Sequence, residues 1–257
     1  MGLPTCSVEK SICSFLEFHN LILQNWSKLR IGRAIYRGNG NFYHRLVPGV
    51  GRKKGPSQSQ EKLLRYEKVV FDEFKRGVGA YKGVVPKNDF ELLALAQSHG
   101  LPTRLLDWTE NPYFALYFAV ATHKNKDGRV TMYRSSKRLP QTRIDKGKPF
   151  NNTKLHIYTP QSISARIRAQ RGIFTLHPNI CNGLDDEYME RYLPKNSKDW
   201  KLDSVKIDSK YKPEIRKQLY KIGIHEEMLF PDLDGFSRHV AWKHFAFSKH
   251  SRGHARD

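Results

Sequence analysis

The distribution of apolar and polar residues predicts helices and strands that intermix without regular alternation. Apolar side chains recur with helical spacing in four segments, which predicts amphipathic helices. These segments are residues 7–26, 61–74, 89–99 and 210–222. A nearly continuous apolar segment at residues 112–121 is typical of a buried helix. Apolar runs bounded by turn residues predict strands at residues 33–38, 129–133 and 172–177. We therefore expect an α+β fold with a mixed sheet core and flanking helices.

The order of these elements contains no clear internal boundary, so we expect a single domain. It is predicted to span residues 31–245, after an N-terminal helical segment at residues 1–30 and before a basic, disordered tail at residues 246–257. Residues 52–60 form a basic stretch rich in Gly, Pro and Ser, which is expected to be a loop able to contact phosphates. Residues 137–160 are polar and indicate an insertion.

The charge of the chain favours an acidic partner. Lys and Arg total 45 against 25 Asp and Glu, which gives a net charge of +20. Because each neutralised phosphate releases counterions, RNA or another nucleic acid is the expected partner. A tightly bound acidic protein is the alternative. The 14 Phe and 12 Tyr residues supply apolar surface for a core.

Several classes of protein do not fit the sequence. No apolar run approaches the roughly 20 residues of a membrane helix, and no secretory signal is visible, so a cytoplasmic protein without membrane contact is expected. Cys6, Cys13 and Cys181 are unpaired by spacing and indicate reduced thiols. The late histidines, such as His225 and His239, lack a zinc-ligand spacing, so no metal is predicted.

Residues 95–109 place many specific polar side chains between two apolar segments. Such a density next to a core indicates a loop that carries a site. A hydrogen-bonded structural loop is the alternative. In that case, Arg104 and Asp107 would form an ion pair within their own loop, and Trp108 would belong to the core.

Three ordered motifs accompany this stretch. They are Tyr36-Arg37-Gly38, residues 166–176 and residues 229–235. Together with residues 95–109, these motifs resemble the FRG domain family, which is named for a Phe/Tyr-Arg-Gly motif. Activity does not follow from this resemblance alone, because the family is defined by its sequence more than by a reaction.

The same order has a more distant resemblance to ADP-ribosyltransferases of the Arg-Ser-Glu type. Tyr36-Arg37-Gly38 fits their first strand, and residues 102–109, followed by an Ala- and Phe-rich helix, fit their second motif. Gln170 stands where a Glu would be expected. The resemblance implies an ADP-ribosyltransferase-like fold and NAD as co-substrate.

A set of site residues follows from these resemblances and from side-chain chemistry. The guanidinium fork of Arg37 suits phosphate, and aromatic rings suit stacking on a base. The expected NAD-binding residues are Tyr36, Arg37, Gly38, Gln97, Thr103, Arg104, Trp108, Thr109 and Phe174. The expected catalytic residues are Arg37, His99, Asp107, Gln170 and Glu227. A Gln cannot act as a general base, so the carboxylate is expected from Asp107 first and from Glu226 or Glu227 second.

We expect an enzyme that transfers ADP-ribose from NAD to nucleic acid, with RNA as the expected acceptor. Such an enzyme damages its host, so a toxin or phage-defence role and a neutralising antitoxin-type protein are expected. An NAD glycohydrolase or a protein ADP-ribosyltransferase is one alternative. A non-catalytic nucleic-acid-binding module is another, and Gln170 favours it. For Arg37, His99 and Gln170, a purely structural role is the competing interpretation.

Overall fold

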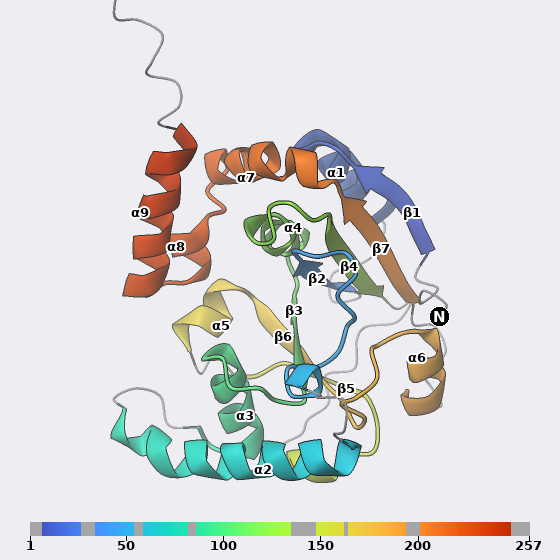
Figure 1. Cartoon of the computed structure of the whole chain (residues 1–257), viewed down its shortest axis with the longest axis vertical. Coiled ribbons are helices and arrows are strands. Elements are labelled where there is room, and N and C mark those ends of the chain that lie inside the picture. The colour runs from blue at the N-terminus through green and yellow to red at the C-terminus, as the bar shows by residue number, and fades with distance from the viewer. Residues whose placement is uncertain are drawn as a thin grey trace, which may run out of the picture.

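The computed structural model describes residues 7–26, 34–53, 59–81, 86–134, 148–161, 164–193 and 201–247. These residues form a single mixed α+β unit around a seven-stranded sheet (Figure 1). The strands are β1 (Ser7–Ile12), β2 (Ala34–Asn39), β3 (Leu105–Thr109), β4 (Gly128–Arg134), β5 (His156–Tyr158), β6 (Gly172–Leu176) and β7 (Lys201–Ile207). Their order across the sheet is β1-β7-β4-β2-β3-β6-β5. The β1–β7 pair is parallel and all other neighbours are antiparallel.

Helices flank this sheet. They are α1 (Phe15–Leu21), α2 (Gln60–Gly77), α3 (Asp89–Ser98), α4 (Pro112–Ala121), α5 (Ala165–Ala169), α6 (Asp186–Tyr192), α7 (Lys212–Lys221), α8 (Glu226–Leu229) and α9 (Leu233–Phe247). No helix in the described ranges is both long and apolar enough to cross a membrane.

Most of the predicted elements are confirmed. Helices α2, α3, α4 and α7 and strands β2, β4 and β6 lie where the apolar patterns place them. Local capping explains two of the helix starts. The side chain of Asn88 accepts hydrogen bonds from the backbone amides of Phe90 and Glu91 at the start of α3. At the start of α4, Asn111 does the same for Tyr113, and Pro112 occupies the first turn.

The N-terminal prediction is wrong in its first half. Residues 7–12 form strand β1, which pairs with β7, and the helix begins only at Phe15. Ser14 caps this helix by accepting from the amide of Glu17. The segment therefore contributes an edge strand to the sheet.

Other elements escaped the pattern. Residues 105–109, expected to be loop, form β3, and the predicted insertion at 137–160 contains the short strand β5. Strand β7 and helices α6 and α9 were not predicted. Residues 54–58 of the basic loop and 248–257 of the predicted tail lie outside the described ranges.

One face of the sheet carries two groups of helices. A first apolar cluster packs α4, α7 and α1 against β2, β4 and β7. A second packs α2, α3 and α5 against β3, β5 and β6. The opposite face packs against α6 and the segment around Leu46. Residues of both helical groups, together with residues of β2 and β3, line one cavity, which is the candidate site.

Candidate functional site

The sheet opens between β2 and β3. Strand β2 pairs with β4 over six residue pairs, whereas it meets β3 through the single pair Tyr36–Thr109. A cavity of about 230 Å³ lies at this opening. Its lining residues are Tyr36, Arg37, Gly38, Gln97, Ser98, Asp107, Trp108, Thr109, Phe118, Arg166, Ile167, Gln170, Gly172, Phe174 and Phe230. Nine predicted site residues are among them, although they come from sequence positions as far apart as 36 and 174.

Arg37 bridges the two strands at the opening. Its Nη1 donates to the backbone carbonyl of Asp107 and lies 3.4 Å from Oδ2 of the same residue. The Arg37 side chain is 13% exposed and that of Asp107 is 48% exposed. This ion pair therefore joins a buried guanidinium to a carboxylate that reaches solvent.

The carboxylate of Asp107 is held by a chain of hydrogen bonds. Gln97 donates from Nε2 to Oδ2 of Asp107 at 2.9 Å. The Thr103 hydroxyl donates to Oε1 of Gln97 at 2.7 Å and accepts from the amide of Leu105. Thr103 lies outside the cavity lining, so it orients Gln97 and does not bind a cavity ligand directly.

The surroundings of Arg37 leave it with excess positive charge. Burial lowers its pKa to about 10, and the nearby charges of Arg52 and Arg129 act in the same direction against the opposing effect of Asp107. The guanidinium remains protonated at neutral pH. Within the described residues, its buried Nε has no hydrogen-bond partner. An anion in the cavity would offset the positive charge around this guanidinium.

Arg166 is a second arginine of the cavity, and sequence reasoning did not select it as a site residue. It donates from Nη1 to the carbonyl of Ser98 at 2.7 Å and from Nη2 to Asp232 at 2.9 Å. Its guanidinium stacks 4.9 Å from the ring centre of Phe230. Arg166 is the first residue of the motif at 166–176, but nothing in that motif indicated that it lines the same cavity as Arg37.

Aromatic side chains form one wall of the cavity. Phe118 of α4 and Phe230, which follows α8, meet edge to face at 6.1 Å. Phe174 of β6 also lines the cavity, as predicted for a stacking residue. Phe118 and Phe230 were missed because they belong to segments that read as core and turn.

Gln170 lies in the cavity wall but is engaged with the backbone. The side-chain Nε2 of Gln170 donates to the backbone carbonyl of Leu229 at 3.1 Å. The backbone carbonyl of Gln170 accepts from the hydroxyl of Thr109 at 2.7 Å. Gln170 thereby ties the end of α5 to α8 and to β3. This bonding fits the structural interpretation of Gln170, although both Gln170 and Thr109 line the cavity.

Trp108 belongs mainly to the core beneath the cavity. Its indole N–H donates to the Thr175 hydroxyl at 2.9 Å, and that hydroxyl lies 2.9 Å from Nε2 of His177. His177 is fully buried, and this burial, with a smaller effect of Arg37, lowers its pKa to about 3. A neutral imidazole therefore lies beneath the charged Arg37.

The structure shows a packing requirement for glycine at position 38. A Cβ there would lie 1.8 Å from the backbone oxygen of Ala115. The glycine is thus required by the close packing of α4 on β2. Gly38 also lines the cavity, so its predicted contact with NAD stays a prediction beside this packing role.

The placement of Arg104 corrects its prediction as an NAD-binding residue. Its guanidinium forms a buried ion pair with Glu67 of α2 at 2.7 Å, and the two side chains are 2% and 1% exposed. It also donates to the carbonyls of Pro149 and Phe150. The predicted alternative, an Arg104–Asp107 pair, is wrong as well, because Asp107 pairs with Arg37.

Two predicted catalytic residues lie apart from the cavity lining. His99 is exposed at the end of α3. Glu227 lies on α8 beside His239, at 3.9 Å. Glu226, its neighbour, is bound by Arg216, Arg238 and Tyr117. Of the carboxylates that sequence reasoning put forward, Asp107 is the one that lines the cavity.

One comparison with known proteins matches a segment that includes both β2 and β3. Residues 32–128 match the family model of the FRG domain. This FRG segment contains β2, α2, α3, β3 and α4, and with them Arg37, Gln97 and Asp107. It covers less than half of the chain and leaves out Arg166, Gln170 and Phe230.

No curated protein and no solved structure matches the chain. The resemblance of residues 166–176 and 229–235 to later FRG motifs therefore stays a prediction. The structure adds their position. Residues of both segments line the same cavity as residues of the FRG segment.

Proposed function

We propose that the chain is an ADP-ribosyltransferase that uses NAD at the cavity between β2 and β3. The observation that carries the proposal is the Arg37–Asp107 pair, a buried cation and a solvent-reaching carboxylate side by side in one cavity. The distant resemblance to Arg-Ser-Glu-type enzymes adds the reaction class. An ADP-ribosyltransferase-like fold is part of this proposal.

The lining residues fit parts of NAD. Arg37 and Arg166 each have a buried Nε without a partner among the described residues, and guanidinium groups bind phosphate oxygens well. Phe118, Phe174 and Phe230 offer ring faces or edges to a base. The cavity of about 230 Å³ is below the roughly 300–1,000 Å³ of drug-sized sites. It would hold one end of the dinucleotide, and the remainder would extend toward solvent.

In the proposed reaction, the bond between nicotinamide and ribose C1′ breaks and its electron pair leaves with nicotinamide. Positive charge develops on the ribose, and the carboxylate of Asp107 stabilises it. A nucleophile of the acceptor then bonds to C1′ and loses its proton to solvent. Gln97 keeps the Asp107 carboxylate oriented throughout, through its 2.9 Å hydrogen bond.

RNA is the proposed acceptor because the chain carries a net charge of +20. Transfer to a base requires that base to be unpaired and unstacked, which favours single strands. An enzyme of this kind harms its own host. The proposal therefore includes a toxin or phage-defence role and a neutralising partner protein.

One other function is favoured by a specific observation. Gln170 stands where the resembling enzymes carry a Glu, and its amide is committed to the carbonyl of Leu229. This favours a nucleic-acid-binding module without catalysis. Such a module would bind RNA with a steep salt dependence and would show no affinity for NAD.

The test incubates the purified chain with NAD labelled in its adenylate part, beside single-stranded RNA, duplex DNA and a protein mixture. Label on RNA together with released nicotinamide is expected. Nicotinamide without label on any acceptor would indicate a glycohydrolase, and label on protein would indicate a protein transferase. Salt-dependent RNA binding with neither product would overturn the proposal in favour of the binding module.

A further inference from the structure

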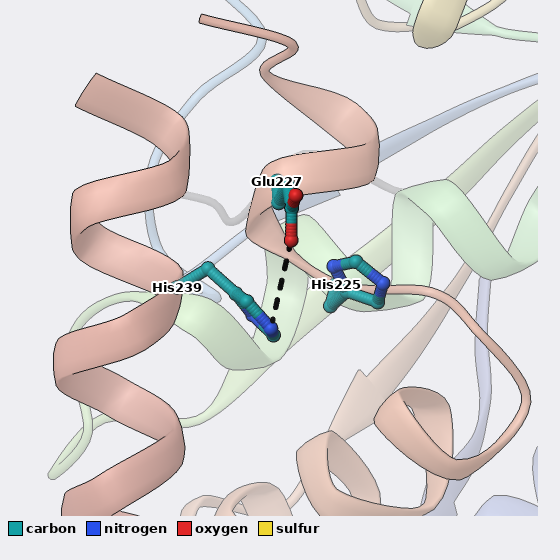
Figure 2. A group of neighbouring side chains, drawn as sticks. All are labelled: His225, Glu227 and His239. Atoms are coloured by element: carbon teal, nitrogen blue, oxygen red, sulfur yellow. Dashed lines mark ion pairs between the residues drawn. The ribbon is translucent and has the colours of Figure 1, made fainter. Parts of the chain in front are cut away.

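A second cluster of chemically active side chains lies at the junction of α8 and α9. His225, Glu227 and His239 point toward one another there (Figure 2). Each offers one ligand atom, and these atoms all lie within 4.8 Å of one another. The two imidazole rings stack with their centres 4.3 Å apart. The cluster is separate from the cavity lining, so it is not explained by the proposed reaction.

The protein does not satisfy these side chains by itself. The Nδ1 atoms of His225 and His239 are buried and have no hydrogen-bond partner within the described residues. The contact from His239 Nε2 to Glu227 Oε2 is 3.9 Å, which is too long for a hydrogen bond. A buried polar atom without a partner destabilises the folded state. Nε2 of His239 thus faces Glu227 without a hydrogen bond to it, and both imidazoles keep a nitrogen that a ligand could bind.

We propose that His225, Glu227 and His239 bind a divalent transition-metal ion, with zinc as the best candidate. Two imidazoles and one carboxylate form a donor set that suits zinc, whose bonds to nitrogen are about 2.0–2.1 Å long. In a tetrahedral site, such bonds place ligand atoms roughly 3.4 Å apart. Reaching this geometry requires side-chain rotations that close the cluster by about 1–1.5 Å and turn the stacked imidazoles, so that their in-plane lone pairs converge on the ion.

The neighbouring residues fix which carboxylate takes part. Glu226 is already bound by Arg216, Arg238 and the hydroxyl of Tyr117. Glu227 has the His239 contact and a side chain that is 47% exposed, so it can move toward a metal. The ring of Tyr220 stacks on His239 at 5.6 Å and limits the movement of that imidazole.

The metal would hold α9 in place against α8. This helix leaves several large apolar side chains exposed, and His239 is one of its few buried residues. In Figure 1, α9 stands at one side of the molecule, next to α8. A metal bound to His239 on α9 and to Glu227 on α8 would join the two helices. Because Phe230 follows α8 directly and lines the cavity, the same ion would also steady that wall.

The test measures zinc binding to the full chain by calorimetry in the presence of a phosphine reductant, with cobalt(II) absorption as a second readout. One tight equivalent is expected, with a visible cobalt spectrum of nitrogen and oxygen ligation, and zinc should raise the melting temperature. His239→Ala and Glu227→Gln should each lose the tight equivalent. His244→Ala, at an exposed histidine of the same helix, should keep it.

Because His239→Ala removes a buried ring, its folding is checked by circular dichroism, and Glu227→Gln serves as the variant that leaves packing intact. The proposal is overturned if the wild-type chain binds no zinc equivalent tightly. It is equally overturned if folded Glu227→Gln and His225→Ala both bind zinc as the wild type does, since the ion would then lie elsewhere. Neither result depends on NAD.

Discussion

At the scale of single residues, two arginine–carboxylate pairs differ in how completely the surrounding protein bonds the arginine. Arg104 is fully buried and bonded to Glu67 and two backbone carbonyls, so its role is to hold the fold together. The Arg37 side chain is 13% exposed, its Nε has no partner among the described residues, and the charges of two other arginines act on it. The partners of both arginines come from distant segments, and no sequence pattern predicted them.

Replacing Asp107 by Asn tests the proposed role of its carboxylate. The amide keeps the size of the side chain but removes the charge that would stabilise the developing cation. We expect kcat to fall by roughly 100-fold or more with a smaller change in KM. The matched control is Glu110→Gln, an exposed carboxylate just beyond β3 that does not line the cavity. Equal activity of Asp107→Asn and Glu110→Gln would exclude the catalytic role.

His177 predicts a pH dependence of stability. Burial lowers its pKa to about 3 in the folded state, while an unfolded histidine titrates near 6.5. Above pH 6.5 the imidazole is neutral in both states and does not affect stability. As the pH falls below 6.5, the unfolded chain takes up a proton that the folded chain does not, so the folded state is destabilised. From pH 7 to pH 5, this group should lower the free energy of unfolding by about 2 kcal/mol.

Urea unfolding of the wild type and of His177→Gln at these two pH values measures this difference. The variant should lose about 2 kcal/mol less than the wild type over the interval. Parallel losses in the two proteins would show that His177 is not kept neutral by its surroundings.

At the scale of elements, the sequence predicted those helices and strands whose formation depends on residues close together in the chain. Helix α4 was predicted with its observed bounds because it is apolar throughout and begins with Asn111 and Pro112. Strand β1 was mistaken for helix because its strand identity depends on pairing with β7, about 200 residues later. The opening between β2 and β3 is likewise a property of two distant strands. The sequence indicated which residues form the cavity better than it indicated the shape of that cavity.

Gly38→Ala tests the packing of α4 on β2. The new Cβ would meet the Ala115 carbonyl at 1.8 Å, so helix or strand must shift. We expect a loss of about 1–3 kcal/mol or more in the free energy of unfolding, measured by urea denaturation. Gly77→Ala, with open space around the added methyl, should be neutral or slightly stabilising. Similar stability of the two variants would contradict the packing role of Gly38.

At the scale of the whole molecule, the charge and the cavity point to the same kind of ligand. The chain carries a net charge of +20, and the lining of the cavity contains two arginines and one aspartate. The FRG segment supplies one side of this cavity, and α5, β6 and Phe230 supply the other. An anionic ligand such as NAD would therefore contact both parts of the chain at once.

Calorimetric titration of NAD into the purified chain tests the central claim most directly. The wild type and Arg65→Met, a change at an exposed arginine on α2, should bind NAD with the same affinity. Arg37→Met should bind it about tenfold or more weakly, because a charge-assisted hydrogen bond contributes about 1.5–3 kcal/mol. Circular dichroism confirms that each variant is folded. Binding by Arg37→Met equal to the wild type, or no binding by the folded wild type, would contradict the account.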